Sequence, residues 1–176
     1  AYHGIGDPAV VSFMPPVDAS LGPAHRPHSV HSSAGLAPGT AESVVVLPFN
    51  DADACETILR DNAADLAAVI IDPLSTATGL VLPQRAFLDR LRAVTRELGI
   101  LLIFDEIVSF RLSMGGTQGA YEIDPDLTCL AKVIAGGTAG GTEDARARPR
   151  DPISIRPSAL FVWRLLSFEW SATHVL

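Results

Sequence analysis

The stretch "GILLIFDEIVSF" (residues 99–110) contains an uninterrupted apolar run, Ile100 to Phe104, that ends on the acidic pair Asp105-Glu106. An apolar run of this length predicts a strand that is buried on both faces of a sheet. Carboxylates directly after such a strand are well placed for a ligand, because open α/β sheets bind ligands at the carboxyl ends of their strands. The stretch therefore indicates a fold class and the location of a site.

The segments before this strand alternate between strand and helix patterns. VVVLPF (44–49) and AAVIID (67–72) predict two more strands, and a helix that begins at Asn50 or Asp51 predicts the connection between them. A second helix is predicted by apolar residues at helical spacing, namely Phe87, Leu88, Leu91, Val94 and Leu98. Gly99 is placed to end that helix. This order predicts an α/β fold with a three-layer, mainly parallel sheet covered on both faces.

The two ends of the chain differ from this middle region. Residues 1–43 are rich in Pro, Gly, Ser and His, which predicts irregular structure around one short strand at VVSFM (10–14). Residues 138–176 begin with an Arg- and Pro-rich link and continue into an aromatic stretch of weak periodicity. We therefore predict one partial domain over 1–137 and a divergent tail of unclear structure over 138–176.

Composition narrows the function. The chain has 176 residues, 48% of them hydrophobic, and a net charge of −7, which argues against nucleic-acid binding because phosphate contacts need clustered Lys and Arg. Cys55 and Cys129 lie far apart, so a disulfide framework or zinc site is not expected and a reducing cytoplasm fits better. The sequence lacks an apolar run long enough for a membrane span and has no signal peptide.

The acidic pair at the end of "LLIFDE" has three interpretations. Asp105 and Glu106 can cap a turn or pair with an arginine such as Arg111. They can be the Mg²⁺-binding acids of a P-loop NTPase, although the sequence shows no GxxxxGK[ST] turn. Asp105 can also pair with the protonated ring nitrogen of a pyridoxal cofactor, where a carboxylate keeps the ring an electron sink.

Lys132, in "CLAKVIAGG" (129–137), is the only lysine of the chain. Its neighbours Leu130, Ala131 and Val133 are apolar, and burial of an amine keeps a neutral, nucleophilic fraction. A Schiff-base lysine needs such a setting. The alternative is a surface lysine whose stem lies along apolar residues while its charge reaches water.

Several segments match one family pattern in order and at compatible spacing. The matching segments are AYHG (1–4), LPFND (47–51), AAVIIDP (67–73), Asp105-Glu106-Ile107, Phe110-Arg111, Gly115-Gly116-Thr117-Gln118, Pro125-Asp126-Leu127-Thr128 and KVIAGG (132–137). With them the chain resembles the class III pyridoxal-phosphate aminotransferases, most of all glutamate-1-semialdehyde 2,1-aminomutase and its relatives. The resemblance covers about residues 1–137 and implies part of the large domain of the PLP-dependent transferase fold type I.

The resemblance also implies roles for individual residues. Lys132 would form the Schiff base with pyridoxal 5'-phosphate and then move a proton between substrate and cofactor. Asp105 would bind the ring nitrogen. Tyr2 would stack on one face of the ring, with His3 beside it, and Ile107 would pack on the other face. For Tyr2 and Ile107, ordinary core packing is the competing interpretation.

The function implied is transamination, or intramolecular amino transfer, on a small amino acid or semialdehyde. Family members form homodimers with shared active sites. This sequence departs from the pattern at Ala131 and Asp72, where the family has Gly and Glu, and "GTAGGTEDARARPRD" (137–151) lacks the family's phosphate-binding segment. We therefore expect a truncated chain that lacks much of the dimer surface. The alternative is a catalytically silent relic or interaction module that retains the fold without binding the cofactor.

Overall fold

A computed structural model describes residues 2–15, 18–75, 77, 79–136, 140–145 and 160–166. Within these ranges the strands are β1 (Val44–Pro48), β2 (Leu66–Ile71), β3 (Leu101–Asp105), β4 (Leu127–Ala131), β5 (Gly141–Ala145) and β6 (Leu160–Leu166). They form one sheet in the order β1-β6-β2-β3-β4-β5. All neighbours are parallel except β4 and β5. The predicted α/β class with a mainly parallel sheet is confirmed, and the strands predicted at 44–49, 67–72 and 100–104 are β1, β2 and β3.

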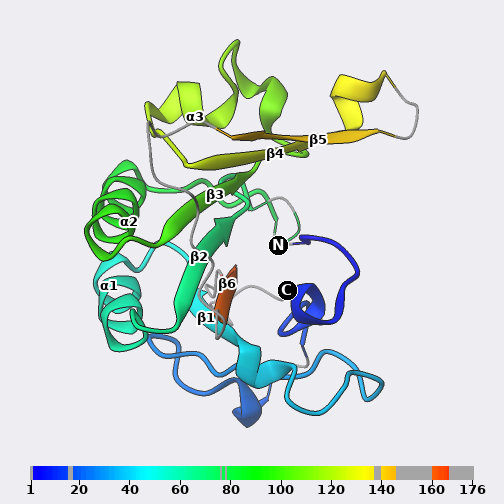
Figure 1. Cartoon of the computed structure of the whole chain (residues 1–176), viewed down its shortest axis with the longest axis vertical. Coiled ribbons are helices and arrows are strands. Elements are labelled where there is room, and N and C mark those ends of the chain that lie inside the picture. The colour runs from blue at the N-terminus through cyan, green and yellow to red at the C-terminus, as the bar shows by residue number, and fades with distance from the viewer. Residues whose placement is uncertain are drawn as a thin grey trace, which may run out of the picture.

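Helices α1 (Ala52–Asp61) and α2 (Arg85–Leu98) lie side by side on one face of the sheet (Figure 1). The Asp51 carboxylate accepts a hydrogen bond from the backbone N–H of Ala54 at 3.0 Å and so caps the start of α1. Gly99 ends α2 in the left-handed conformation, with φ of 71°. Both ends were predicted from these residue types.

The main core lies between the sheet and these two helices. Its strand residues alternate along the chain, since Val69 and Ile71 of β2 and Leu102 and Phe104 of β3 all point into the same buried cluster. Phe87 of α2 is 1% exposed and meets the ring of Phe49 with centroids 5.4 Å apart. The apolar residues that the sequence showed at helical spacing therefore form the face of α2 that packs against the core.

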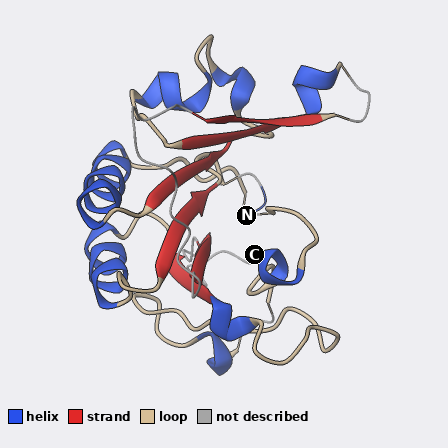
Figure 2. Cartoon of the chain, in the orientation of Figure 1, coloured by secondary structure: helices blue, strands red, loops and turns tan. Residues whose placement is uncertain are grey.

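The N-terminal segment lies along the opposite face of the sheet from α1 and α2 (Figure 2). The strand predicted at 10–14 is wrong. A 3-10 helix, Asp7–Val10, is followed by a turn in which Ser12 and Met14 have φ of 52° and 46°, values that a strand cannot adopt. Val11 is fully buried there, so its apolar character reflects packing rather than strand pairing.

Strand β6 comes from the aromatic stretch near the end of the chain and lies between β1 and β2, parallel to both. Its pairing shifts register on each side, between Val44 and Val46 of β1 and between Leu66 and Ala68 of β2. The pairs β2–β3 and β3–β4 show no such shift. The predicted tail thus contributes β5 and β6 to the sheet, while residues 146–159 and 167–176 lie outside the described residues.

We predict that Phe87→Ala lowers the free energy of unfolding by about 3–5 kcal/mol, because it leaves a cavity under α2. Met114→Ala is the control, since Met114 is fully exposed and its truncation is expected to change stability by less than about 0.5 kcal/mol. Urea denaturation followed by circular dichroism measures both values. Equal losses in the two variants would contradict this account of the core.

Candidate active site

The carboxyl ends of β3 and β4 bring two predicted site residues to the same edge of the sheet. Asp105 is the last residue of β3, is 5% exposed, and pairs with Cys129 of β4. Lys132 follows Cys129 by three residues, directly after β4 ends at Ala131. An extended chain advances about 3.3 Å per residue. The Lys132 backbone therefore lies about 10 Å beyond Cys129 in the direction of β4.

Asp105 is held by a residue from the other end of the described chain. His3 Nδ1 lies 2.6 Å from Asp105 Oδ2, and the His3 side chain is 1% exposed. A carboxylate only accepts hydrogen bonds, so His3 carries its proton on Nδ1 when Asp105 is ionised. Asp105 Oδ1 accepts a second hydrogen bond from the Ile107 N–H at 3.2 Å. These bonds fix the orientation of the carboxylate.

The second ring nitrogen of His3 is buried and has no hydrogen-bond partner among the described residues. A buried polar atom of this kind is uncommon and marks a strained or functional position. The family resemblance implied a place in the site for both His3 and Asp105, but it did not predict that they touch. Only the fold brings together two residues separated by 102 positions.

Lys132 has an unusual backbone conformation. It begins the 3-10 helix Lys132–Ala135 with φ of 50°, in the left-handed region. This conformation costs a residue with a Cβ about 1–2 kcal/mol, and such strain concentrates at functional sites. Lys132 is exposed, so it is not buried as its apolar neighbours suggested.

Tyr2 and Ile107 lie close in the sequence to the two members of the His3–Asp105 pair. Tyr2 precedes His3, is 50% exposed, and packs edge to face on Phe13 with ring centroids 5.5 Å apart. Ile107 is half-buried and follows Asp105 by two residues. Tyr2 is thus half-exposed one residue before His3, and the Ile107 N–H binds the Asp105 carboxylate.

Glu106, which the sequence suggested only as a turn cap, an arginine partner or a Mg²⁺-binding acid, is a further functional candidate. Its side chain is fully buried, and its carboxylate accepts the N–H groups of Thr117 at 2.6 Å and Gln118 at 2.9 Å. Burial raises the pKa of Glu106, and these two hydrogen bonds oppose that shift. The signal was present in the Gly115-Gly116-Thr117-Gln118 motif, which forms the start of α3 (Gly116–Tyr121).

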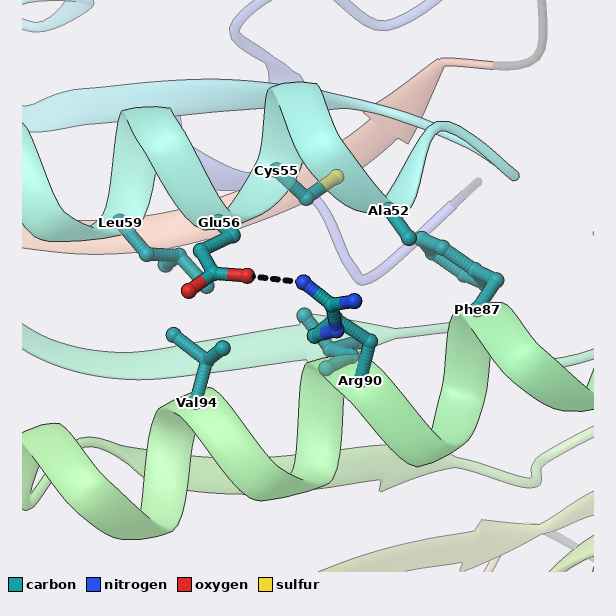
Figure 3. A pocket seen from close by; sticks show the side chains of 8 residues that line it. Ala52, Cys55, Glu56, Leu59, Phe87, Arg90 and Val94 are labelled. Atoms are coloured by element: carbon teal, nitrogen blue, oxygen red, sulfur yellow. Dashed lines mark hydrogen bonds and ion pairs between the residues drawn. The ribbon is translucent and has the colours of Figure 1, made fainter.

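A shallow groove lies between α1 and α2, and the side chains that line it hold the two helices together. Arg90 of α2 reaches across it to hydrogen-bond Glu56 of α1 (Figure 3). Cys55 beneath them is 2% exposed and donates its S–H to the Pro48 carbonyl at 3.0 Å. Burial raises the pKa of the Cys55 thiol well above its ordinary value, so it is protonated and unreactive.

We predict that Cys55 resists thiol reagents in the folded protein, whereas Cys129, which is partly exposed, reacts first. Labelling the single-cysteine variants Cys55→Ser and Cys129→Ser with a chromogenic disulfide separates the two rates. The variant that keeps Cys55 should react only after denaturant is added. Rapid labelling of that variant under native conditions would show that the α1–α2 contact is open.

The sequence of the chain matches a known family. The sequence model described as Aminotransferase class-III matches residues 28–154. The chain belongs to the class III aminotransferase family. A curated relative, glutamate-1-semialdehyde 2,1-aminomutase of Roseiflexus castenholzii, is 45% identical over 137 residues, which are 77% of this chain and 30% of the relative. The same enzyme of Desulfitobacterium hafniense is 42% identical over 137 residues, again 77% of this chain and 30% of the relative.

Solved structures show the same similarity in three dimensions. An omega-transaminase of Sphaerobacter thermophilus matches with a TM-score of 0.77 and 41% identity, over 83% of this chain and 33% of that one. A glutamate-1-semialdehyde aminomutase of Pseudomonas aeruginosa in complex with PMP matches with a TM-score of 0.65 and 30% identity, over 90% and 35%. The class III chain described here thus spans about a third of the length of these relatives.

The described ranges were also compared with the requirements of a membrane-spanning helix and of a metal site. No helix there is long and apolar enough to cross a membrane. The same residues contain no group of three or more His, Cys, Asp or Glu side chains arranged to hold a metal ion.

Proposed function

We propose that this chain carries the cofactor-holding core of a pyridoxal-phosphate-dependent aminotransferase or aminomutase that acts on a small amino acid or semialdehyde. The observation that carries the proposal is the buried Asp105 carboxylate, fixed by His3 at 2.6 Å, on the strand next to the one that leads into Lys132. One of the solved relatives is described as a transaminase with PLP bound, and another is in complex with PMP.

The residues at the sheet edge fit such a cofactor. When bound, pyridoxal phosphate supplies a conjugated ring that accepts electrons from a substrate carbon. Asp105 would hold a proton on the ring nitrogen, and His3 would keep that carboxylate oriented. Lys132 would attach the cofactor through its amine and carry the proton that moves during amino transfer. Tyr2 would cover one face of the ring and Ile107 the other.

The partners proposed are small-molecule amino donors and acceptors, with a second copy of the chain as in a homodimer. Exposed apolar side chains on the described surface, Ile5, Met14, Leu112 and Met114 among them, are of the kind that a second subunit covers. Two cysteines without a disulfide suit a reducing cytoplasm, which we propose as the location.

We predict that borohydride reduction in the presence of pyridoxal phosphate attaches one cofactor to the chain, on Lys132. Because Lys132 is the only lysine, the labelled peptide identified by mass spectrometry is unambiguous. The wild-type protein should also gain a near-visible absorption band that disappears on reduction. The Lys132→Arg variant keeps the charge and should show neither signal.

The N-terminal amine is the built-in control, because it remains in Lys132→Arg and reports non-specific reaction with the aldehyde. Labelling confined to that amine in the wild-type protein would contradict the proposal and leave a fold-retaining module without the cofactor. Catalysis is tested separately, by following amino transfer from candidate donors to the loaded protein.

We predict that Asp105→Asn reduces cofactor affinity by at least about tenfold, because a neutral amide no longer stabilises a protonated ring nitrogen. Absorbance titration with pyridoxal phosphate gives the dissociation constants. Asp89→Asn is the matched control, since Asp89 is half-exposed on α2 and pairs only with Arg85 among the described contacts. Equal affinity of Asp105→Asn and wild type would remove Asp105 from the site.

A further inference from the structure

Glu106 follows Asp105 directly. It forms hydrogen bonds with three segments, namely β4, the loop after β3 and α3. Its backbone N–H donates to the Cys129 carbonyl of β4 at 3.0 Å, and its carbonyl accepts from the Phe110 N–H at 3.0 Å. Its carboxylate binds the first turn of α3 through Thr117 and Gln118. A fully buried residue whose backbone and carboxylate both form hydrogen bonds holds its surroundings in one arrangement.

The connection continues from α3 back to β4. The Gln118 side chain donates from Nε2 to Thr128 Oγ1 at 3.1 Å, and Thr128 is 4% exposed. The Thr117 hydroxyl donates to the Ser109 carbonyl at 3.2 Å, which ties α3 to the loop after β3. Glu106 therefore holds β4 twice, once through its own N–H and once through Gln118, within four residues of Lys132.

Gly116 makes room for this carboxylate. A Cβ atom at Gly116 would lie 2.2 Å from Glu106 Oε2, and Gly116 has φ of 71°, which favours glycine. The Gly115-Gly116 turn thus lets the backbone approach Glu106 so closely that two successive N–H groups reach its oxygens. The local sequence is shaped around the Glu106 side chain.

We propose that Glu106 is a positioning residue that fixes the end of β4, and with it Lys132, relative to Asp105. The inference rests on the proposed function, because it gives Glu106 a role toward the cofactor residues on each side. The competing role is a purely local one, in which Glu106 stabilises α3 and nothing beyond it. The two roles differ in whether a change at Glu106 is felt at Lys132.

Glu106→Gln tests the difference in the cofactor-free protein. The amide has one accepting oxygen, so its NH₂ group faces one of the two N–H donors of α3 and a hydrogen bond is lost. Amide hydrogen exchange of Thr117 and Gln118 should become about tenfold faster or more. We expect the NMR amide signals of Ala131 and Lys132 to shift as well. Changes confined to α3, with Lys132 unmoved, would overturn the proposal.

Two variants control this experiment. Glu122→Gln makes the same chemical change at the other end of α3, where the side chain is 80% exposed, and should leave Lys132 unaffected. Thr128→Val removes only the acceptor of the Gln118 side chain and keeps a similar shape. It should shift the Lys132 signal without changing the exchange of Thr117. If Glu106→Gln does not fold, this variant alone decides, and an unmoved Lys132 signal again overturns the proposal.

The same variants are then loaded with pyridoxal phosphate and reduced. We expect Glu106→Gln and Thr128→Val to bind the cofactor more weakly than Glu122→Gln and wild type. If the wild-type protein binds no cofactor on Lys132, the proposed function fails, while the NMR result still decides the positioning role. If the wild type binds and Glu106→Gln binds equally well with an unmoved Lys132, only the positioning role fails.

Discussion

The parallel pairing of β3 with β4 is the constraint on which the rest of the site depends. This pairing places Asp105 opposite Cys129, and both strands end at the same edge of the sheet. The residues of β3 before Asp105 are apolar on both faces of the sheet, so the first polar side chains of this strand come where it ends. The acidic pair at the end of β3 is divided by this geometry, since successive side chains point in opposite directions. Asp105 meets the N-terminal segment, and Glu106 meets α3.

Much of the fold was predictable because local pattern and tertiary packing agree. The apolar runs became β1, β2 and β3 within a residue of their predicted bounds, and α2 ended at Gly99 as its sequence indicated. Segments whose burial depends on distant partners were not predictable in the same way. Val11, in the segment predicted as a strand, is buried without pairing in the sheet, and the aromatic stretch that forms β6 has no period-2 alternation that would identify it.

The candidate site divides along the same line. Asp105 and Lys132 were candidates from residue type and position on the chain, with roles implied by the family resemblance, and both lie at the predicted sheet edge. The hydrogen bond between His3 and Asp105 was beyond sequence reasoning, because periodicity carries no information about a contact across 102 positions. The burial of Glu106 could not be predicted from the sequence either, because a glutamate is expected at the surface unless buried partners for it are known.

The central place of β6 has a consequence for the order in which the molecule assembles. β1 and β2 are joined by α1 alone, yet the strand between them comes from the far end of the described chain. Closing this part of the sheet requires contacts of very long sequence separation, which form late because loop closure is entropically costly. During synthesis the edges of β1 and β2 that face each other would stay unpaired until residues 160–166 had been made. Unpaired strand edges of this kind can pair with other chains and so promote aggregation.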